Sequence, residues 1–371
     1  MEKRPTSAYI NTEALKFNYF NLKEQVPENT KFMAIVKANA YGHGDVEVAR
    51  VLQSLGCEYL AVAIPEEGVR LRLGGIKTPI VILGGVYPGQ LGEIFDLDLT
   101  PVVFDINTAR LLDVFAKRAG VEKKVHVKID TGMGRLGLLP GQVEGFFKEF
   151  KSLSNLKLEA VLSHFSESES PDRSFSQAQI RLFRKAVEEI RALGIAPGFI
   201  DMANSAGAVN LKDSCFDLIR PGIMLYGSYP APHLRDKITL RPVMELKTRI
   251  LQLKDLGPKQ PVSYGRRFVT KRDSTIAVLP IGYADGLPRR LTGAGEVLIR
   301  GRRAPIAGTV CMDLTMADVT GIPGVAVGDE AVIIGKQGGE VITAEEIAEK
   351  VGTISYEIFC NISPRVPRIY V

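Results

Sequence analysis

Lys37 is the residue of this sequence with the clearest potential for covalent chemistry. It directly follows the apolar run at residues 32–36, so we expect its amine to extend from the end of a buried strand. Burial and neighbouring cations lower the pKa of a lysine amine, and the neutral amine is the form that attacks a carbonyl to give a Schiff base. Lys37 is therefore a candidate Schiff-base lysine.

Polar side chains also follow several later apolar runs. They are Lys128, Asp130, Arg135, Ser163, His164, Asn204, Ser205, Arg220 and Gly222. Turns are polar in any protein, so a single cluster of this kind could merely mark the end of a strand. Several clusters after different runs favour instead one shared site.

Two kinds of glycine-containing segment could bind a phosphate. Residues 132–137 match the GxGxxG pattern of dinucleotide-binding proteins. The Pro-Gly pair at 140–141 interrupts the helix that should follow, and the segment does not belong to a first βαβ unit, so both features count against a nucleotide site. Residues 205–207, at the start of a predicted helix, and Gly222 with Ile223 offer backbone N–H groups where barrel proteins commonly hold a phosphate.

Eight apolar runs have the character of strands that are buried on both faces. They are residues 32–36, 59–64, 79–83, 100–104, 125–129, 158–162, 199–203 and 216–219. Segments with helical periodicity separate many of them, and Asn11 is a candidate N-cap for an earlier amphipathic helix. A doubly wound sheet also alternates strands and helices but rarely has eight units, so the repeat favours a (β/α)8 TIM barrel. The polar clusters then stand at the carboxyl ends of the strands, where such barrels carry their active sites.

The sequence changes character after residues 240–250. Strand-like runs now follow one another through turns, with one short helix predicted at 343–352. We expect a barrel domain at residues 1–235 and a C-terminal all-β domain at 236–371, with the first residues of the chain able to pair with the β-domain. The linker between them contains Pro230 and Pro232.

The composition limits the compartment and the partners. With 371 residues, 45% of them apolar, the chain can bury two cores. No apolar stretch approaches the roughly 18 residues of a membrane span, and no signal-peptide core follows the N-terminus, so we expect a soluble cytoplasmic protein without membrane contact. A net charge of +5 without aromatic residues among the basic ones argues against nucleic acid. The four cysteines and four histidines lack metal-ligand spacing, so we expect reduced thiols and no metal.

A series of short motifs runs through the chain from Tyr9 to Val371. They are AIVKANAYGHG (34–44), KIDTGMGRLG (128–137), SHF (163–165), ANSAG (203–207), IRPGIMLYG (219–227), VSYG (262–265), LPIGYADG (279–286), GTVCMD (308–313) and the C-terminal SPRVPRIYV. Together, and in this order, they resemble the alanine racemase family of fold-type III pyridoxal 5′-phosphate enzymes. The combination is specific, whereas the Lys37 motif alone is shared in looser form with decarboxylases of that fold type and with single-domain cofactor carriers.

The resemblance implies that pyridoxal 5′-phosphate is held as a Schiff base on Lys37. The other positions of the implied cofactor site are Tyr41, His164, Asn204, Ser205, Arg220, Gly222, Ile223 and Tyr356. Arg220 would face the pyridine nitrogen, with His164 behind it. Because arginine only donates hydrogen bonds, the nitrogen would stay unprotonated and the ring would be a weaker electron sink.

Racemisation removes a proton from one face of Cα and delivers another to the opposite face. The resemblance implies that Lys37 serves one face and Tyr264 the other. An unassisted tyrosine acting as a base at pH 7 would cost about 4 kcal/mol, so cations must surround it. The implied substrate-binding residues are Arg135, Met312, Asp313 and Tyr283. In the family the β-domain residues come from the other subunit of a head-to-tail homodimer, so the active sites would be shared between subunits.

The implied reaction interconverts L- and D-alanine and supplies D-alanine for the peptidoglycan of the cell wall. Lys128 matches a lysine that the family often carries as a carbamate able to hold Arg135. The chain departs from the usual family sequence at residues 166–169 and 266–268, which leaves the breadth of substrates open. Broad-specificity or serine racemisation and, less favoured, a cofactor carrier without catalysis remain alternatives, whereas a decarboxylase would need no second base.

Overall fold

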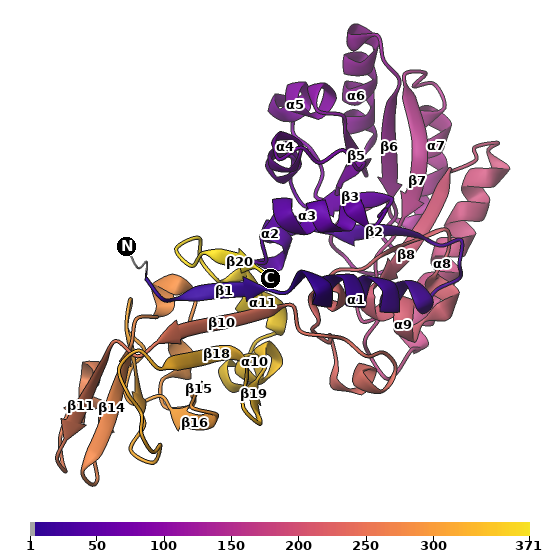
Figure 1. Ribbon diagram of the computed structural model, residues 1–371. Helices are drawn as coiled ribbons and strands as arrows, with labels where there is room; N and C mark the ends of the chain where they lie inside the picture. The colour runs from indigo at the N-terminus through magenta and orange to yellow at the C-terminus, as the bar shows by residue number, and fades with distance from the viewer. Residues whose placement is uncertain (1–3) are drawn as a thin grey trace.

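Eight parallel strands close into a barrel in the computed structural model of the protein, which describes residues 4–371 (Figure 1). The strands are β2 (Lys31–Ile35), β3 (Tyr59–Val62), β4 (Ile80–Ile82), β5 (Leu99–Val103), β6 (Lys123–Lys128), β7 (Leu156–Leu162), β8 (Phe199–Asn204) and β9 (Leu218–Arg220). Pairing of Phe32 in β2 with Ile219 in β9 closes the barrel. Every residue of β3, β4 and β5 is buried, which explains their largely apolar sequence. The predicted TIM barrel is confirmed.

Helices connect successive strands and lie on the outside of the barrel (Figure 1). They are α3 (Asp45–Ser54), α4 (Pro65–Leu73), α5 (Leu91–Asp96), α6 (Ile106–Ala119), α7 (Val143–Phe150), α8 (Ser174–Ala192) and α9 (Ser205–Asn210), and α1 (Thr12–Glu24) precedes the first barrel strand. Asn11 caps α1 as predicted, because its Oδ1 accepts the backbone N–H of Ala14 at 2.8 Å.

The C-terminal domain is built mostly of strands. Its larger sheet has the order β16 (Arg302–Pro305), β15 (Glu296–Ile299), β18 (Glu330–Gln337), β10 (Met244–Arg249), β1 (Ser7–Ile10) and β20 (Arg368–Tyr370), with β19 (Glu340–Ile342) paired to β18. A smaller sheet contains β11 (Gln252–Leu256), β14 (Ser274–Leu279) and β17 (Thr315–Asp318), and β12 (Pro261–Val262) pairs with β13 (Phe268–Val269).

Two helices interrupt this strand-rich domain. The predicted helix is present as α10 (Ala344–Val351), and a second helix, α11 (Ser355–Cys360), was not predicted. The strand-like run at residues 248–253 is divided between β10 and β11. The chain changes its hydrogen-bond partners at this point. The N–H of Ile250 donates to the carbonyl of Asp329, next to β18 of the larger sheet, whereas the N–H of Leu251 donates to the carbonyl of Val278 in the smaller sheet.

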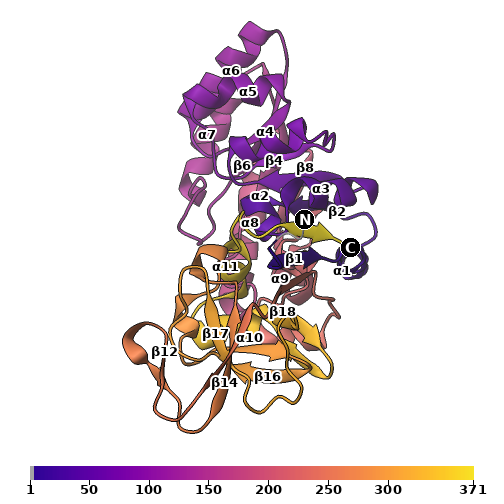
Figure 2. The ribbon, with the colours of Figure 1, turned by 60° about the vertical axis from the view of Figure 1, so that its left-hand side comes forward.

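Both ends of the chain lie in the larger C-terminal sheet. Strand β1 pairs antiparallel with β10 and parallel with β20, so Ala8 stands opposite both Leu246 and Arg368. Figure 2 shows β20 and α11 at the junction between the barrel and the rest of the strand-rich domain. Over residues 4–371 no helix has both the length and the apolar character needed to cross a membrane.

Candidate active site

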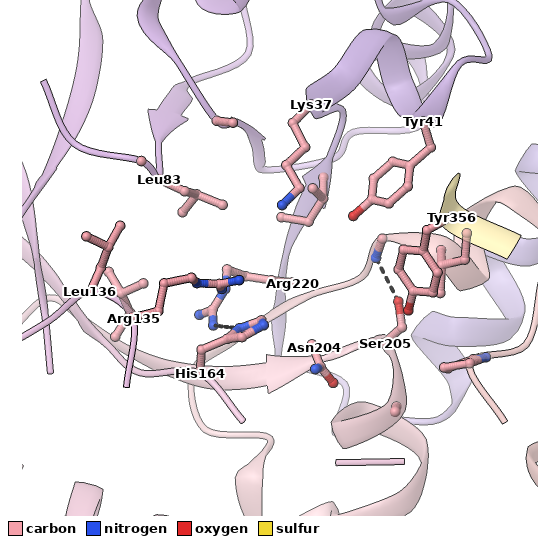
Figure 3. Close-up of a pocket in the computed structure, with 18 of the residues that line it drawn as sticks. Lys37, Tyr41, Leu83, Arg135, Leu136, His164, Asn204, Ser205, Arg220 and Tyr356 are labelled. Atoms are coloured by element: carbon pink, nitrogen blue, oxygen red, sulfur yellow. Dashed lines mark hydrogen bonds between the residues drawn. The ribbon is translucent and has the colours of Figure 1, made fainter. Parts of the chain in front are cut away.

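A cavity of about 390 Å³ opens at the carboxyl ends of the barrel strands. It is lined by Ile35, Lys37, Tyr41, Ala63, Leu83, Gly84, Lys128, Arg135, Leu136, Leu162, His164, Glu169, Asn204, Ser205, Ala206, Arg220, Gly222, Ile223, Pro230 and Tyr356. The structure therefore brings together every residue that was predicted to bind the cofactor, together with Lys128 and Arg135 (Figure 3). They come from six separate segments of the chain, which the fold makes neighbours.

Lys37 begins an unusual turn, α2 (Lys37–Tyr41), directly after β2. The φ angles of Ala38, Asn39, Ala40 and Tyr41 lie between 52° and 56°, so the turn is left-handed. For L-residues this conformation costs roughly 1–2 kcal/mol each. Its effect is that the amine of Lys37 and the hydroxyl of Tyr41 both point into the cavity (Figure 3).

The surroundings of Lys37 disfavour its charged form. Burial lowers the pKa of the amine, and the nearby guanidinium of Arg135 lowers it further, while the carboxylate of Glu67 partly opposes both effects. A larger fraction of the amine is therefore neutral near pH 7 than for an exposed lysine, as nucleophilic or basic chemistry requires.

Hydroxyl and backbone groups gather at one end of the cavity. Ser205 is buried at the start of α9, and its Oγ accepts the N–H of Gly222 at 2.8 Å. A Cβ at Gly222 would lie only 2.7 Å from the hydroxyl oxygen of Tyr41, so a larger residue here would displace the Tyr41 hydroxyl. The ring of Tyr356 packs 5.9 Å from that of Tyr41. Hydroxyl groups such as those of Tyr41, Ser205 and Tyr356 can donate to the oxygens of a phosphate group.

Asn204 lies beside these groups and has a structural role. Its Oδ1 accepts the backbone N–H of Gly207 at 2.9 Å and the hydroxyl of Ser168 at 2.8 Å. It therefore caps α9 and fixes the loop that follows β7, while still lining the cavity.

The buried Arg220 and the half-buried His164 form a pair in the cavity. Arg220 is in direct contact with the buried carboxylate of Asp201, and its Nη2 donates to Nδ1 of His164 at 3.3 Å. Burial and the positive charge of Arg220 lower the pKa of His164 well below its usual value. The imidazole is thus neutral, with Nδ1 as acceptor and the proton assigned to Nε2.

The GxGxxG segment binds a carboxylate of its own chain. Asp130 Oδ1 accepts the N–H groups of Gly132, Met133 and Gly134 at 2.9, 2.8 and 3.1 Å, and Oδ2 accepts that of Arg135 at 3.1 Å. These bonds lower the pKa of Asp130. The N–H groups are therefore occupied, which explains why the motif is no nucleotide site, and the wrapped loop places Arg135 at the cavity.

Lys128 lies beneath this loop at the end of β6 and is buried. Burial and the charges of Arg220, Arg135 and Lys37 lower the pKa of its amine to about 8. Several like charges therefore surround Lys128 in the folded chain.

Four predicted residues do not reach this cavity. Tyr264, Tyr283 and Met312 are 73%, 41% and 53% exposed, and Asp313 is exposed and pairs with Arg365 at 2.8 Å. Hydrogen bonds of Tyr283 to Cys311 and of Thr309 to the carbonyl of Tyr264 connect the segments that carry them. We call this surface of Tyr264, Tyr283, Met312 and Asp313 the tyrosine face. It belongs to the C-terminal domain and stays outside the cavity of its own chain.

The comparisons with known proteins cover nearly the whole chain. Residues 10–230 match the family model "Alanine racemase, N-terminal domain", and residues 243–370 match "Alanine racemase, C-terminal domain". The chain belongs to the alanine racemase family. A curated alanine racemase from Halothermothrix orenii is 49% identical over 99% of this chain and 97% of its own length, and one from Geobacter sulfurreducens is 45% identical over 100% and 98%.

Solved structures of alanine racemases also share the fold. The alanine racemase of Clostridium difficile 630 superimposes with a TM-score of 0.95 at 36% identity, covering 100% of this chain and 97% of that one. The complex of that enzyme with cycloserine gives 0.93 at 35% identity, with coverage of 100% and 96%. The resemblance found in the motifs is confirmed.

Some residues of the site escaped sequence reasoning in this alanine racemase homologue. Asp201 was read only as part of an apolar run, although an acid inside such a run needs a buried partner and could have been flagged. Leu83, Leu136 and Pro230 line the cavity without any chemical signature. Within residues 4–371 no cluster of three or more histidine, cysteine or acidic side chains could hold a metal ion.

Proposed function

We propose that this protein interconverts L- and D-alanine with pyridoxal 5′-phosphate as its cofactor. The observation that carries the proposal is the cavity at the strand ends. It brings together Lys37, whose pKa is lowered, the Arg220–His164 pair, and the hydroxyl groups of Tyr41, Ser205 and Tyr356. Family membership and the names of its relatives support the same reaction. When bound, the cofactor would draw electrons from the substrate and make the proton on Cα removable.

The residues present fit this cofactor. Lys37, Lys128, Arg135 and Arg220 give the cavity an excess of positive charge, which suits a phosphate and a substrate carboxylate. We propose that Lys37 holds the cofactor, that Tyr41, Ser205, Gly222, Ile223 and Tyr356 surround its phosphate, and that Asn204 fixes the neighbouring helix start. Arg220 would donate to the ring nitrogen, and the neutral His164 would orient Arg220.

Two side chains would move protons at opposite faces of the substrate. The amine of Lys37 would take or give the proton on one face, and the hydroxyl oxygen of Tyr264 on the other. Because Tyr264 lies on the exposed tyrosine face, we propose that it comes from the partner subunit of a head-to-tail homodimer. The positive charge of Arg135 would favour the tyrosinate and hold the substrate carboxylate together with the backbone N–H of Met312 of the partner subunit. Asp313 and Tyr283 of the partner subunit would line the same wall of the site.

We propose that Lys128 carries a carbamate. A neutral amine is the form that adds carbon dioxide, and the pKa of about 8 makes this form accessible near neutral pH. The resulting anion would lie between Arg220 and Arg135 and turn repulsion into attraction.

We also propose that the enzyme acts in the cytoplasm and supplies D-alanine for peptidoglycan. The likeness to the solved structure of the biosynthetic alanine racemase from Pseudomonas aeruginosa, with a TM-score of 0.87 and 30% identity over the whole of both chains, supports a biosynthetic role.

The direct test is the absorbance spectrum of the purified protein with pyridoxal 5′-phosphate, combined with a coupled assay of L- to D-alanine conversion. We expect the wild-type protein to show visible absorbance of the bound cofactor and to racemise alanine. The Lys37→Ala variant should lose both, because it lacks the amine that holds the cofactor and moves a proton. Full activity in Lys37→Ala would refute the proposal.

A further inference from the structure

The left-handed turn that carries Lys37 needs support from its surroundings. Residues 38–41 all have positive φ, and none of them is glycine. Side chains with a Cβ avoid this region, because the Cβ approaches the following carbonyl oxygen. Consecutive residues in such a conformation persist only where neighbouring groups hold them.

Glu67 binds the first amide of the turn. Its side chain is buried in α4, and Oε1 accepts the N–H of Ala38 at 2.6 Å. Oε2 accepts the N–H groups of Ala63 at 2.8 Å and of Ile64 at 3.4 Å, directly after β3. One carboxylate therefore joins the ends of two neighbouring barrel strands at the residue next to Lys37.

The far end of the turn is held by different groups. Nδ1 of the buried His43 lies 3.0 and 2.9 Å from the carbonyl oxygens of Ala40 and Tyr41. Nε of Arg368, in β20, donates to the carbonyl of Gly42 at 2.9 Å. Glu67 thus supplies the ionic contact at the end where Lys37 stands.

Part of this arrangement is an ordinary helix cap. Glu67 is the third residue of α4, and its bond to Ile64 is the reciprocal half of a capping box. The bond to Ala38 is additional, because it reaches another segment and uses the other oxygen. A cap alone would need only one oxygen.

We propose that Glu67 is a positioning residue for Lys37 and Tyr41. By binding the N–H of Ala38, its carboxylate fixes the left-handed turn and so directs the Lys37 amine and the Tyr41 hydroxyl into the cavity. This inference rests on the proposed function for the role of Lys37, but the effect on the turn itself does not depend on it.

The first test compares Glu67→Gln with Gln142→Ala. Gln142 is an exposed residue whose Oε1 caps Leu139 at 2.8 Å, away from the turn, so its variant controls for the loss of a capping box. In Glu67→Gln an amide N–H₂ must face one of the backbone donors. We expect cofactor affinity and kcat to fall by roughly tenfold or more, as for one charge-assisted hydrogen bond, with little change in KM. Amide hydrogen exchange of residues 35–44 in the cofactor-free protein should accelerate in Glu67→Gln and not in Gln142→Ala.

The second test is rescue by glycine at position 38. Glycine adopts positive φ without the Cβ penalty, so the double variant Glu67→Gln/Ala38→Gly should recover much of the lost cofactor affinity and exchange protection. A double variant whose cofactor affinity and exchange protection are no better than those of Glu67→Gln overturns the proposal. So does a Glu67→Gln protein that behaves like Gln142→Ala. Wild-type protein that fails to bind cofactor or to racemise alanine would contradict the proposed function instead, and hydrogen exchange would still decide the role of Glu67.

Discussion

Lys128 is a residue whose surroundings oppose its own charge. Its pKa is about 8 in the folded chain, whereas an exposed lysine titrates near 10.5. The folded protein therefore binds this proton less tightly than the unfolded chain does. Below about pH 8 Lys128 is protonated in both the folded and the unfolded chain, and its buried charge lowers the stability in full. Between about pH 8 and 10.5 only the unfolded chain keeps this proton, so the stability of the folded protein increases as the pH rises.

The variant Lys128→Met should reveal this penalty. In buffer free of carbon dioxide we expect it to raise the free energy of unfolding at pH 7, by on the order of 3 kcal/mol at most. The gain should shrink between pH 8 and 10.5, as followed by urea denaturation at several pH values. If carbamylation occurs, bicarbonate should stabilise the wild-type protein but not Lys128→Met, and ¹³C-bicarbonate should give a carbamate resonance only in the wild type. Crystal density showing a plain ammonium in the presence of bicarbonate would contradict the carbamate.

The loop between β6 and α7 shows how one element positions Arg135, the residue that we propose to bind the substrate. Four consecutive N–H groups close around Asp130, and a Cβ at Gly137 would lie 2.5 Å from the Asp130 nitrogen. This close approach requires glycine at position 137. The loop is therefore rigid around a carboxylate, and Arg135 takes its direction from that carboxylate.

The variant Asp130→Asn should weaken both the loop and substrate binding. An amide has one acceptor oxygen, so some of the four N–H groups lose their partner, and we expect a loss of about 1–3 kcal/mol in stability. KM for alanine should rise more than kcat falls, because Arg135 is displaced. Folding lowers the pKa of Asp130, so the difference in stability between the wild type and Asp130→Asn should be fully present at neutral pH. It should disappear in acid, below the usual pKa range of an aspartate, because the wild-type carboxylate is then protonated.

A suitable control is Thr343→Ala, which removes the N-cap bond to Glu346 in α10 of the other domain. It should cost about 1 kcal/mol of stability and leave KM unchanged. An unchanged KM in Asp130→Asn would show that the loop does not position Arg135.

The elements that sequence reasoning identified are those with a strong local signal. Most of the barrel strands are largely apolar, and α1 follows Asn11, whose side chain caps it. The rim positions of Lys37, His164, Ser205 and Arg220 followed from their places after these strands. The strand ends therefore predicted most of the site.

The elements that escaped prediction depend on long-range contacts. Ala38, Asn39 and Tyr41 favour right-handed conformations, and the left-handed turn arises from partners such as Glu67 and Arg368, far away in sequence. Helix α11 has only six residues, too few for a periodic signal. The contact of Asp201 with Arg220 likewise joins two separate strands and was invisible in the linear sequence.

At the scale of the whole molecule, the barrel and the strand-rich domain are tied together by the ends of the chain. Strand β1 enters the C-terminal sheet before the barrel begins, and Arg368 of β20 returns to the turn after Lys37. We propose a domain boundary between residues 235 and 236, with β1 as a segment of the second domain. The C-terminal strand therefore contributes to the geometry of a site built on the barrel.

The cavity of one chain contains Lys37 but not Tyr264, and this separation gives the sharpest test of the shared active site. If Tyr264 comes from the partner subunit, each site of a homodimer combines residues of both chains. A heterodimer of Lys37→Ala and Tyr264→Phe chains then holds one doubly altered site and one intact site. Mixing the two inactive variants in equal amounts, with reversible dissociation, should restore roughly a quarter of wild-type activity, because half of the dimers are mixed and each has one intact site. Variants that stay inactive after mixing, while native mass spectrometry shows heterodimers, would place both bases in one chain and require the tyrosine face to fold back onto its own barrel.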